Sequence, residues 1–273
     1  MRCKVNIKNA KKGKTFVESL DYFKGFNFLK PNIIKSLSCT QIFNINMISI
    51  QIQLSDKLYL RDPQQTKLGK KIIEQGIILI DELGFERFTF KKLAEKIAST
   101  EASVYRYFEN KHKFLLYLVS WYWEWVKYQI EFNTNNVDDP KKKLKITLSM
   151  LVESTLTNPA VPHVDEAILH RIVVAEGVKA YHSKDVDDEN KAGLYVTYKS
   201  LCKSLSDKIQ AVNPEFAYAQ TLATTLLEMS NNNIYYAQHL PSLTNIKLNN
   251  GDLSELKALL ELFSCRLLQI ESL

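Results

Sequence analysis

The spacing of apolar residues from Thr66 onward predicts a chain made almost wholly of helices. Leu68, Ile72 and Leu79 fall on one helical face, and Gly84 is a typical residue directly after the end of a helix. The sequence holds only 8 Gly and 7 Pro in 273 residues, which favours long helices over a turn-rich β fold. Further helices are expected over residues 110–132, 140–157, 164–181, 190–211, 214–238 and 253–270.

Residues 89–111 show a different pattern, which predicts two short helices around a tight turn. Thr89 is a good N-cap for the first of these helices. Residues 98–99 form the turn, and the second helix covers residues 101–108 with Thr100 as its N-cap. A helix pair of this kind places its second helix in the major groove of DNA.

The second of these helices has an inner and an outer side. Val104 and Phe108, four residues apart, are expected to anchor it inward. Small side chains on the outer side let the helix approach base edges, and Tyr and Arg side chains reach phosphates or bases. The outer residues are Glu101, Ala102, Ser103, Tyr105 and Arg106. Asn110 caps the following helix, whose first turn carries Lys111 at a place where a phosphate can be held.

Residues 66–115 resemble the DNA-binding domain of the tetracycline-repressor (TetR/AcrR) family. The most specific part is the run Val104-Tyr105-Arg106-Tyr107-Phe108 followed by Lys111, because Tyr-x-Tyr-Phe-x-x-Lys is typical of this family among helix-turn-helix proteins. Gly84-Phe85, Thr89 and Leu93-Ala94 also match. Two residues depart from the family pattern: Ala98 stands where a glycine is usual, and Ser99 stands where a small apolar residue packs.

The resemblance implies an all-α fold, with an N-terminal three-helix helix-turn-helix DNA-binding domain followed by a helical ligand-sensing and dimerisation domain. We expect the DNA-binding domain at residues 65–112 and the second domain at 113–273, after a basic, poorly ordered extension and linker at 1–64. By the same resemblance, phosphates are contacted by Thr89, Tyr105 and Lys111, and bases are read by Glu101, Ala102, Ser103 and Arg106, with Thr100 beside them.

The formal charge of +6 is concentrated at the start of the chain. Residues 1–46 hold nine Lys and Arg against two acidic residues, about +7, which leaves the remainder near −1. Two interpretations of this stretch stay open: a basic arm that follows DNA phosphates, or an extension outside the native protein, with Met47 as the initiator. The nearly neutral remainder argues against a protein that coats DNA non-specifically, because such proteins depend on many phosphate contacts.

An aromatic stripe on the helix after Asn110 has two interpretations. Trp121, Trp125 and Tyr128 share one helical face, and a stripe at this spacing is more often core than pocket. The same face can line an apolar pocket for a small-molecule effector. We therefore take these three residues, together with His170, as the candidate effector pocket.

An alternative function is an all-helical enzyme that uses His163, Glu166 and His170. Spacing places the last two on one helical face, as a metal pair or acid–base groups would require. No nucleophile-and-base set, Gly-rich phosphate loop or metal motif accompanies them. We therefore expect a protein that is not an enzyme and has no metal or cofactor.

The last predicted helix carries a narrow apolar seam, at alternating spacings of three and four residues. Its members are Leu253, Leu256, Leu260, Phe263, Leu267 and Ile270. By the family resemblance, this helix forms a four-helix bundle with a second subunit. A dimer also places two recognition helices about one DNA turn apart on a palindromic site.

The four cysteines lie far apart without paired spacing, which is typical of a protein of the reducing cytoplasm. No apolar run reaches the roughly 18 residues that a membrane helix requires. We therefore predict a cytoplasmic transcriptional repressor without a membrane partner. It binds a palindromic double-stranded DNA operator as a homodimer and responds to a small-molecule effector.

Overall fold

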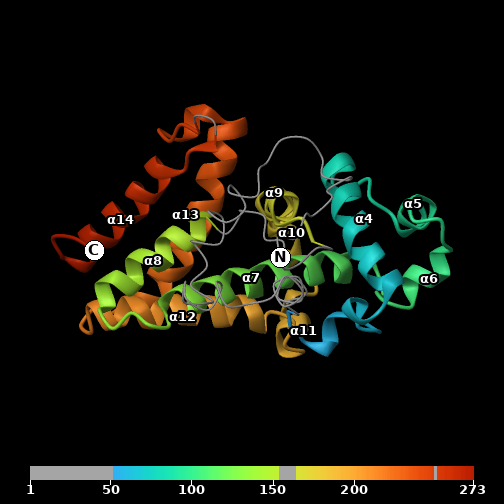
Figure 1. Ribbon diagram of the computed structural model, residues 1–273, viewed down its shortest axis with the longest axis horizontal. Coiled ribbons are helices and arrows are strands. Elements are labelled where there is room, and N and C mark those ends of the chain that lie inside the picture. The colour runs from blue at the N-terminus through green and yellow to red at the C-terminus, as the bar shows by residue number, and fades with distance from the viewer. Residues whose placement is uncertain (1–51, 154–163, 249–250) are drawn as a thin grey trace, which may run out of the picture. The chain divides into compact units, whose positions relative to one another are not determined.

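The computed structural model describes residues 52–153, 164–248 and 251–273. Within these ranges all regular secondary structure is helical, which confirms the all-α prediction (Figure 1). The predicted basic extension, residues 1–46, and His163 lie outside the described residues. None of the helices in the described ranges is both long and apolar enough to cross a membrane.

Three helices form the helix-turn-helix region, and their bounds are α4 (Lys67–Leu83), α5 (Phe90–Lys96) and α6 (Glu101–Tyr105). Thr66 caps α4, because its side chain accepts a hydrogen bond from the Gly69 amide. Gly84 follows α4 with a φ of 76°, a conformation that glycine adopts at little cost. Both ends of the first predicted helix are therefore confirmed.

The turn between α5 and α6 contains the departure from the family pattern noted above. Ala98 has a φ of 53°, in the left-handed region that favours glycine. The Ser99 amide donates to the Ala94 carbonyl across the end of α5 at 2.9 Å. A glycine, which is usual at this position, would adopt this φ without strain. The turn therefore has the backbone conformation expected for glycine, although residue 98 is an alanine.

Helix α7 (Lys111–Thr134) lies at the centre of the fold, because it packs against α8 (Pro140–Glu153), α9 (Glu166–Glu176) and α12 (Val196–Val212). Most residues from Phe114 to Ile130 are buried on all sides of this helix. A helix that is apolar all round needs neighbours on every face. The aromatic run therefore builds the core of the second domain.

The remaining helices complete this domain. They are α10 (Val178–Tyr181), α11 (Val186–Lys191), α13 (Ala219–His239) and α14 (Ser254–Leu268). Two helices predicted as continuous are in fact divided: the one over residues 164–181 is interrupted at Gly177, and the one over 190–211 gives way to α11 and α12, with Gly193 between them at a φ of 81°.

The segment before α4 is packed rather than a free linker. It forms two short 3-10 turns, η1 (Asp56–Leu58) and η2 (Pro63–Gln65), and Leu58 is fully buried against the core. The Leu60 amide donates to the Tyr107 carbonyl at 2.8 Å, directly after α6. The prediction of a linker up to residue 64 is therefore wrong for residues 52–64, because apolar side chains of this segment pack into the core.

Candidate DNA-binding site

Helix α6 is held from its inner side by three buried residues. Val104 and Phe108 are completely buried, and the Phe108 ring meets the Phe114 ring edge-on at 4.9 Å between centroids. Tyr107 is also buried, and its hydroxyl shares a hydrogen bond of 2.7 Å with the Thr66 hydroxyl. The prediction that Val104 and Phe108 anchor the helix is confirmed.

The outer side of α6 is open to solvent. Glu101, Ala102, Tyr105 and Arg106 are exposed, while Ser103 is half-buried. The Tyr105 ring packs edge-on against the Phe90 ring at 5.0 Å, yet 46% of the residue stays exposed. The predicted base-reading and phosphate-binding residues of α6 therefore lie on one accessible surface, with Tyr105 fixed by its contact with Phe90.

The two predicted threonine caps are present. Thr89 accepts a hydrogen bond from the Lys92 amide at 3.3 Å, and Thr100 accepts one from the Ser103 amide at 3.3 Å. The hydroxyls of Thr100 and Ser103 also share a hydrogen bond of 2.8 Å. These bonds order the first turns of α5 and α6, where backbone amides face outward and attract anionic groups.

Lys111 lies in the first turn of α7, as predicted, with Asn110 as the N-cap. Its ammonium donates to the carbonyls of Phe85 and Glu86, each at 3.2 Å, and lies 4.7 Å from the centre of the Phe85 ring. The Lys111 side chain thus connects the start of α7 with the loop that follows α4. These contacts hold the loop after α4 in place. The phosphate contact of Lys111 stays a prediction.

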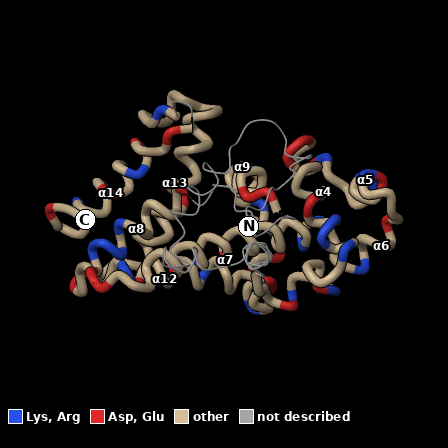
Figure 2. Tube along the Cα trace, viewed as in Figure 1, with Lys and Arg blue, Asp and Glu red and all other residues tan. Residues whose placement is uncertain are grey.

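Arg61 is a further candidate that the sequence pattern does not indicate, because it lies in the segment predicted to be a linker. Its guanidinium lies over the Tyr107 ring, 5.5 Å from the centroid, and the residue is exposed beside α6. The signals that predict an ordered segment are Ser55 and Asp62, each of which caps a short turn with its side chain. Figure 2 shows further Lys and Arg positions on α5.

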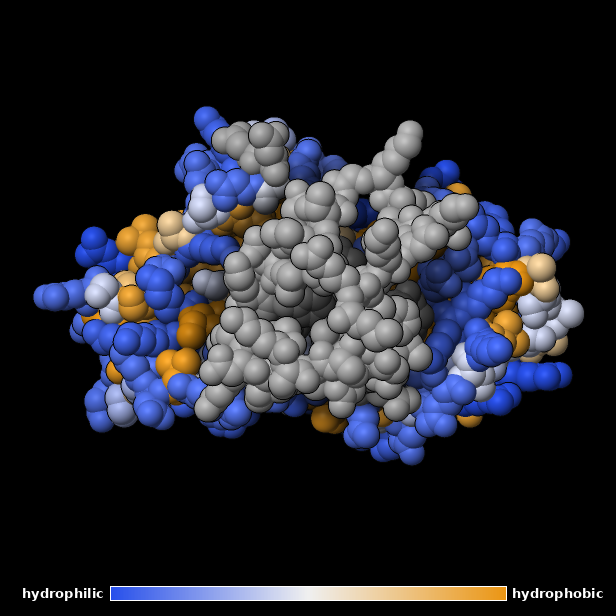
Figure 3. Space-filling view, in the orientation of Figure 1, coloured by the Kyte–Doolittle hydropathy of each residue, from blue (hydrophilic) through white to orange (hydrophobic). Residues whose placement is uncertain are grey.

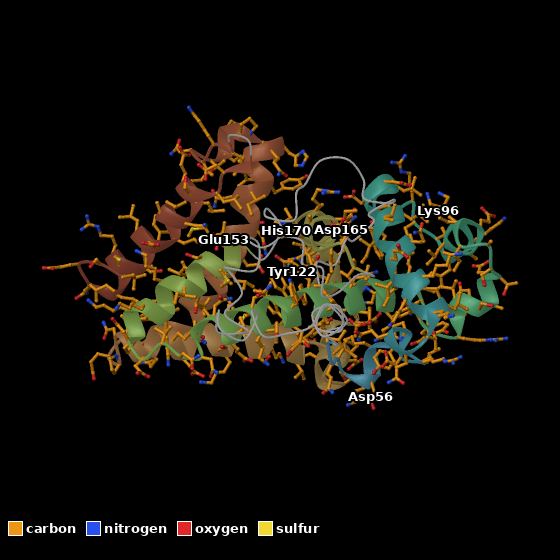
Figure 4. The ribbon with its side chains drawn as sticks, viewed as in Figure 1. Asp56, Lys96, Tyr122, Glu153, Asp165 and His170 are labelled. Carbon is orange, nitrogen blue, oxygen red and sulfur yellow. The ribbon has the colours of Figure 1, made fainter. Side chains whose placement is uncertain are left out.

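The four residues proposed for the effector pocket differ in their ring contacts and in whether they line a cavity. Trp121, Trp125 and Tyr128 form a stacked series along α7, with centroid distances of 6.0 and 5.7 Å. His170 instead packs against the ring of Tyr122, at 5.6 Å (Figure 4). His170 lines a cavity of about 330 Å³, but the other three residues do not line it. A shared effector pocket of these four residues therefore stays a prediction.

Glu166 and His170 are both buried on α9. Burial lowers the pKa of His170 to about 4, although a hydrogen bond with Asn231 opposes this effect. No cluster of three or more His, Cys, Asp or Glu side chains suited to a metal ion is found in the described ranges. The third group of the enzyme alternative, His163, lies outside those ranges.

The predicted seam on α14 is divided between two faces. Leu256 and Leu260 are completely buried within the chain, so they do not belong to an exposed interface. Phe263 and Leu267 are 43% and 50% exposed, whereas Leu253 and Ile270 are half-buried. The prediction of one continuous seam is wrong because α14 packs one side on α8 and α13 of its own chain.

Polar contacts join α4 and the loop after it to α9 and α10. Arg171 donates to both carboxylate oxygens of Asp81, at 3.0 and 2.7 Å. The Phe85 amide donates to Glu176 at 3.0 Å, and Lys179 forms ion pairs with Glu176 at 2.8 Å and with Glu86 at 2.9 Å. These contacts connect the second domain with the end of α4 and the loop that follows it.

A second connection lies at the start of α7. The buried carboxylate of Glu189 accepts hydrogen bonds from the Tyr195 hydroxyl at 2.6 Å and the Lys113 ammonium at 3.2 Å, and pairs with His112 at 3.0 Å. Burial raises the pKa of Glu189, but these partners outweigh that effect and leave the pKa below its ordinary value. This network fixes α11 against the helix that directly follows α6.

Together, α4, α5 and α6 define a helix-turn-helix DNA-binding protein. Residues 72–118 match the family model described as "Bacterial regulatory proteins, tetR family". The chain therefore carries the DNA-binding domain of the tetR family and is a DNA-binding transcriptional regulator. This confirms the family resemblance, and a regulatory family does not favour the enzyme alternative.

Several solved structures are similar to this chain at low identity. They include AibR in complex with isovaleryl coenzyme A and operator DNA (12% identity, 70% of this chain and 97% of that chain, TM-score 0.49), the superantigen PfiT (12%, 73% and 97%, 0.49) and the fatty acid degradation regulator FadR from Bacillus halodurans (16%, 79% and 96%, 0.47). The assignment rests on the family model rather than on these structures. No curated protein matches the sequence.

Proposed function

We propose that this chain is a cytoplasmic, ligand-responsive repressor that binds a palindromic operator as a homodimer. The observation that carries the proposal is the two-sided helix α6. On its inner side Val104, and Phe108 just after the helix, are completely buried, while Tyr105 and the C-cap residue Arg106 remain exposed on the outer side. An exposed helix of this kind, held rigidly from behind, is what entry into the major groove requires.

Within this proposal the DNA contacts have distinct roles. Arg106, with Glu101, Ala102 and Ser103, reads base edges, because Arg forms two hydrogen bonds with guanine and small residues permit a close approach. Thr89, Thr100 and Tyr105 contact phosphates together with the amides at the helix starts. Lys111 acts indirectly by keeping the loop after α4 in place.

Dimerisation is supported by the outer face of α14. Leu262, Phe263 and Leu267 are 49%, 43% and 50% exposed, which forms an apolar surface on one helix (Figure 3). Apolar side chains gathered on one face of a helix are typical of an interface. We place the second subunit on this face, so that two copies of α6 bind successive major grooves.

The effector response depends on contacts between the domains. A difference of 1–3 kcal/mol in effector affinity between two conformations changes DNA affinity by about 5–150-fold. The Arg171–Asp81 pair between α9 and α4, and the Lys179–Glu86 pair between α10 and the loop after α4, are partly or largely exposed, and such pairs are worth roughly 0–1 kcal/mol each. An effector that binds in the second domain can therefore supply enough free energy to shift the DNA-binding domain.

Footprinting on the DNA upstream of the protein's own coding region tests this proposal. We expect protection of two inverted half-sites whose centres are one helical turn, about 10 base pairs, or a multiple of it apart. Protection of a single half-site, or uniform protection without a boundary, would contradict it.

A further inference from the structure

The segment before α4 is fixed to the end of α6 by two hydrogen bonds. The Leu60 amide donates to the Tyr107 carbonyl at 2.8 Å, and the Thr66 hydroxyl shares a hydrogen bond of 2.7 Å with the Tyr107 hydroxyl. Residues 60–66 therefore pass around Tyr107, which directly follows Arg106, the C-cap of α6. These bonds set the position of the segment relative to the helix that is proposed to read DNA.

The same segment is also packed against the rest of the chain. Leu58 and Pro63 are buried, and a Cβ atom on Gly69 of α4 would collide with the Pro63 carbonyl oxygen. The Gln64 side chain donates to the Ile52 carbonyl at 2.7 Å. An exposed side chain in this segment is therefore held on a rigid support, because the backbone is bonded or packed on both sides of it.

Arg61 is an exposed cation in this segment. Its guanidinium lies over the Tyr107 ring, 5.5 Å from the ring centroid. The carboxylate of the neighbouring Asp62 accepts from the Gln64 amide at 2.9 Å. In the described part of the chain Arg61 pairs with no carboxylate, so its positive charge is available to an anionic partner.

A side chain next to α6 lies where the edge of a DNA groove is expected. The major groove is about 12 Å wide, and a helix with its side chains has a diameter of about 10–12 Å, so an inserted helix fills the groove. Groups beside the helix then meet the sugar–phosphate backbone rather than the base edges. Arginine suits this position, because its guanidinium forms two parallel hydrogen bonds with a phosphate.

We propose that Arg61 binds a phosphate of the DNA backbone next to the bases that α6 reads. The inference rests on the proposed function and adds a contact from a segment that precedes residues 72–118, the part of the chain that matches the family model. The contact does not depend on base sequence, and each subunit of the dimer makes it once. It therefore strengthens binding to any duplex that α6 enters.

Salt titrations of DNA binding test this contact with the full chain and its Arg61→Gln variant. Two duplexes serve as probes: the footprinted DNA from upstream of the coding region, and a random-sequence duplex of equal length. Loss of two phosphate contacts, one per subunit, lowers the slope of log K against log salt by about 2. On both duplexes, the ratio of original to variant affinity should therefore shrink about tenfold between about 50 and 200 mM salt.

Two further variants and a stability measurement separate a DNA contact from a structural role. Arg61→Lys keeps the positive charge, so its salt slope should stay close to that of the original protein. Lys142→Gln removes a charge at an exposed position of α8 and should leave the slope unchanged. Because Arg61 also covers the Tyr107 ring, the urea unfolding midpoint of Arg61→Gln is measured as well. A lower midpoint with an unchanged salt slope would show that Arg61 only covers this ring, and would overturn the proposal.

The two duplexes separate this inference from the function on which it rests. An unchanged slope for Arg61→Gln on both duplexes overturns the Arg61 contact and leaves the proposed function intact. A lower slope on the upstream DNA alone also overturns it, because a phosphate contact does not depend on sequence. If the original protein binds neither duplex, the proposed function fails and the Arg61 contact fails with it.

Discussion

Arg171 on α9 and Asp81 on α4 form a two-point ion pair between the second domain and the DNA-binding domain, with N–O distances of 3.0 and 2.7 Å. The pair is partly open to water, because the two side chains are 51% and 27% exposed. Water screens the attraction between such charges, so the pair adds little to the free energy of unfolding. Its two parallel hydrogen bonds mainly fix how α9 is oriented against α4.

A double-mutant cycle measures the strength of this contact. We expect Asp81→Ala, Arg171→Ala and the double variant to give an interaction free energy of about 1 kcal/mol or less in urea unfolding. The physical reason is solvent screening of a half-exposed pair. A value above about 3 kcal/mol would mean that the contact is effectively desolvated, and an effector could not readily shift it.

Lys111→Met tests whether this residue contacts DNA or the protein. The change removes the ammonium that donates to the Phe85 and Glu86 carbonyls but keeps most of the apolar stem. We expect the free energy of unfolding to fall by about 1–3 kcal/mol. The dependence of DNA binding on salt should be unchanged.

The salt dependence decides between the two roles of Lys111. Loss of one phosphate contact per subunit lowers the slope of log K against log salt by about 1 for each contact. A lower slope together with unchanged stability would restore the direct phosphate contact that the sequence pattern predicts. Lys191→Ala, at an exposed position on α11, is the control for loss of a positive charge.

The pH dependence of stability should report on His170. Its pKa is lowered to about 4 in the folded protein, whereas in the unfolded chain it is near 6.5. Between pH 6.5 and pH 4 the unfolded chain binds the proton and the folded protein does not, so stability falls as the pH falls. This contribution is at most about 3 kcal/mol and levels off below about pH 4.

Urea unfolding at pH 7 and pH 4.5 checks this prediction. The loss of stability between the two pH values should be smaller in His170→Gln, because the titrating group is gone. His182→Gln changes an exposed histidine and serves as the control. Equal losses in His170→Gln and the original protein would show that His170 is not held in its neutral form.

The helix-turn-helix region follows from the sequence because its signals are local. Thr89 and Thr100 cap their helices with their own side chains, and Val104 and Phe108 point inward as their four-residue spacing requires. Ala98 shows the limit of such rules, because the surrounding turn imposes a positive φ on a residue that does not favour it.

Features that depend on distant segments were not predictable in the same way. The apolar residues of α14 recur at a regular spacing, which the sequence shows. Whether Leu256 packs within its own chain or against another subunit depends on where α8 and α13 lie. Lys111 reaches carbonyls that lie 26 and 25 residues earlier in the chain, before α5 and α6. The cavity beside His170 exists only because α4, α9 and α13 meet, and no single segment encodes it.

Charged substitutions on the outer face of α14 test the proposed dimer. Phe263→Asp with Leu267→Asp should convert the dimer into monomers, because two charges would be buried at the interface. Leu60→Asp, at a 65% exposed leucine outside this face, is the control and should leave the dimer intact. Sedimentation analysis gives the mass directly, and a double variant that stays dimeric would exclude this face as the interface.

The same monomeric variant should bind its operator far more weakly, because each subunit then contacts DNA with one copy of α6. Linking two sets of DNA contacts in one dimer raises the affinity well beyond that of a single set. Fluorescence anisotropy on full operators and on single half-sites measures this. Equal affinity of monomer and dimer for the full operator would contradict it.

The most direct test of the central claim is a gel shift with DNA from upstream of the coding region, using Tyr105→Ala and Arg106→Ala. Both residues are exposed, so the variants should fold normally. We expect each to weaken binding by about 1–3 kcal/mol per half-site, at least about tenfold overall. Unchanged binding by both variants would show that α6 does not read DNA.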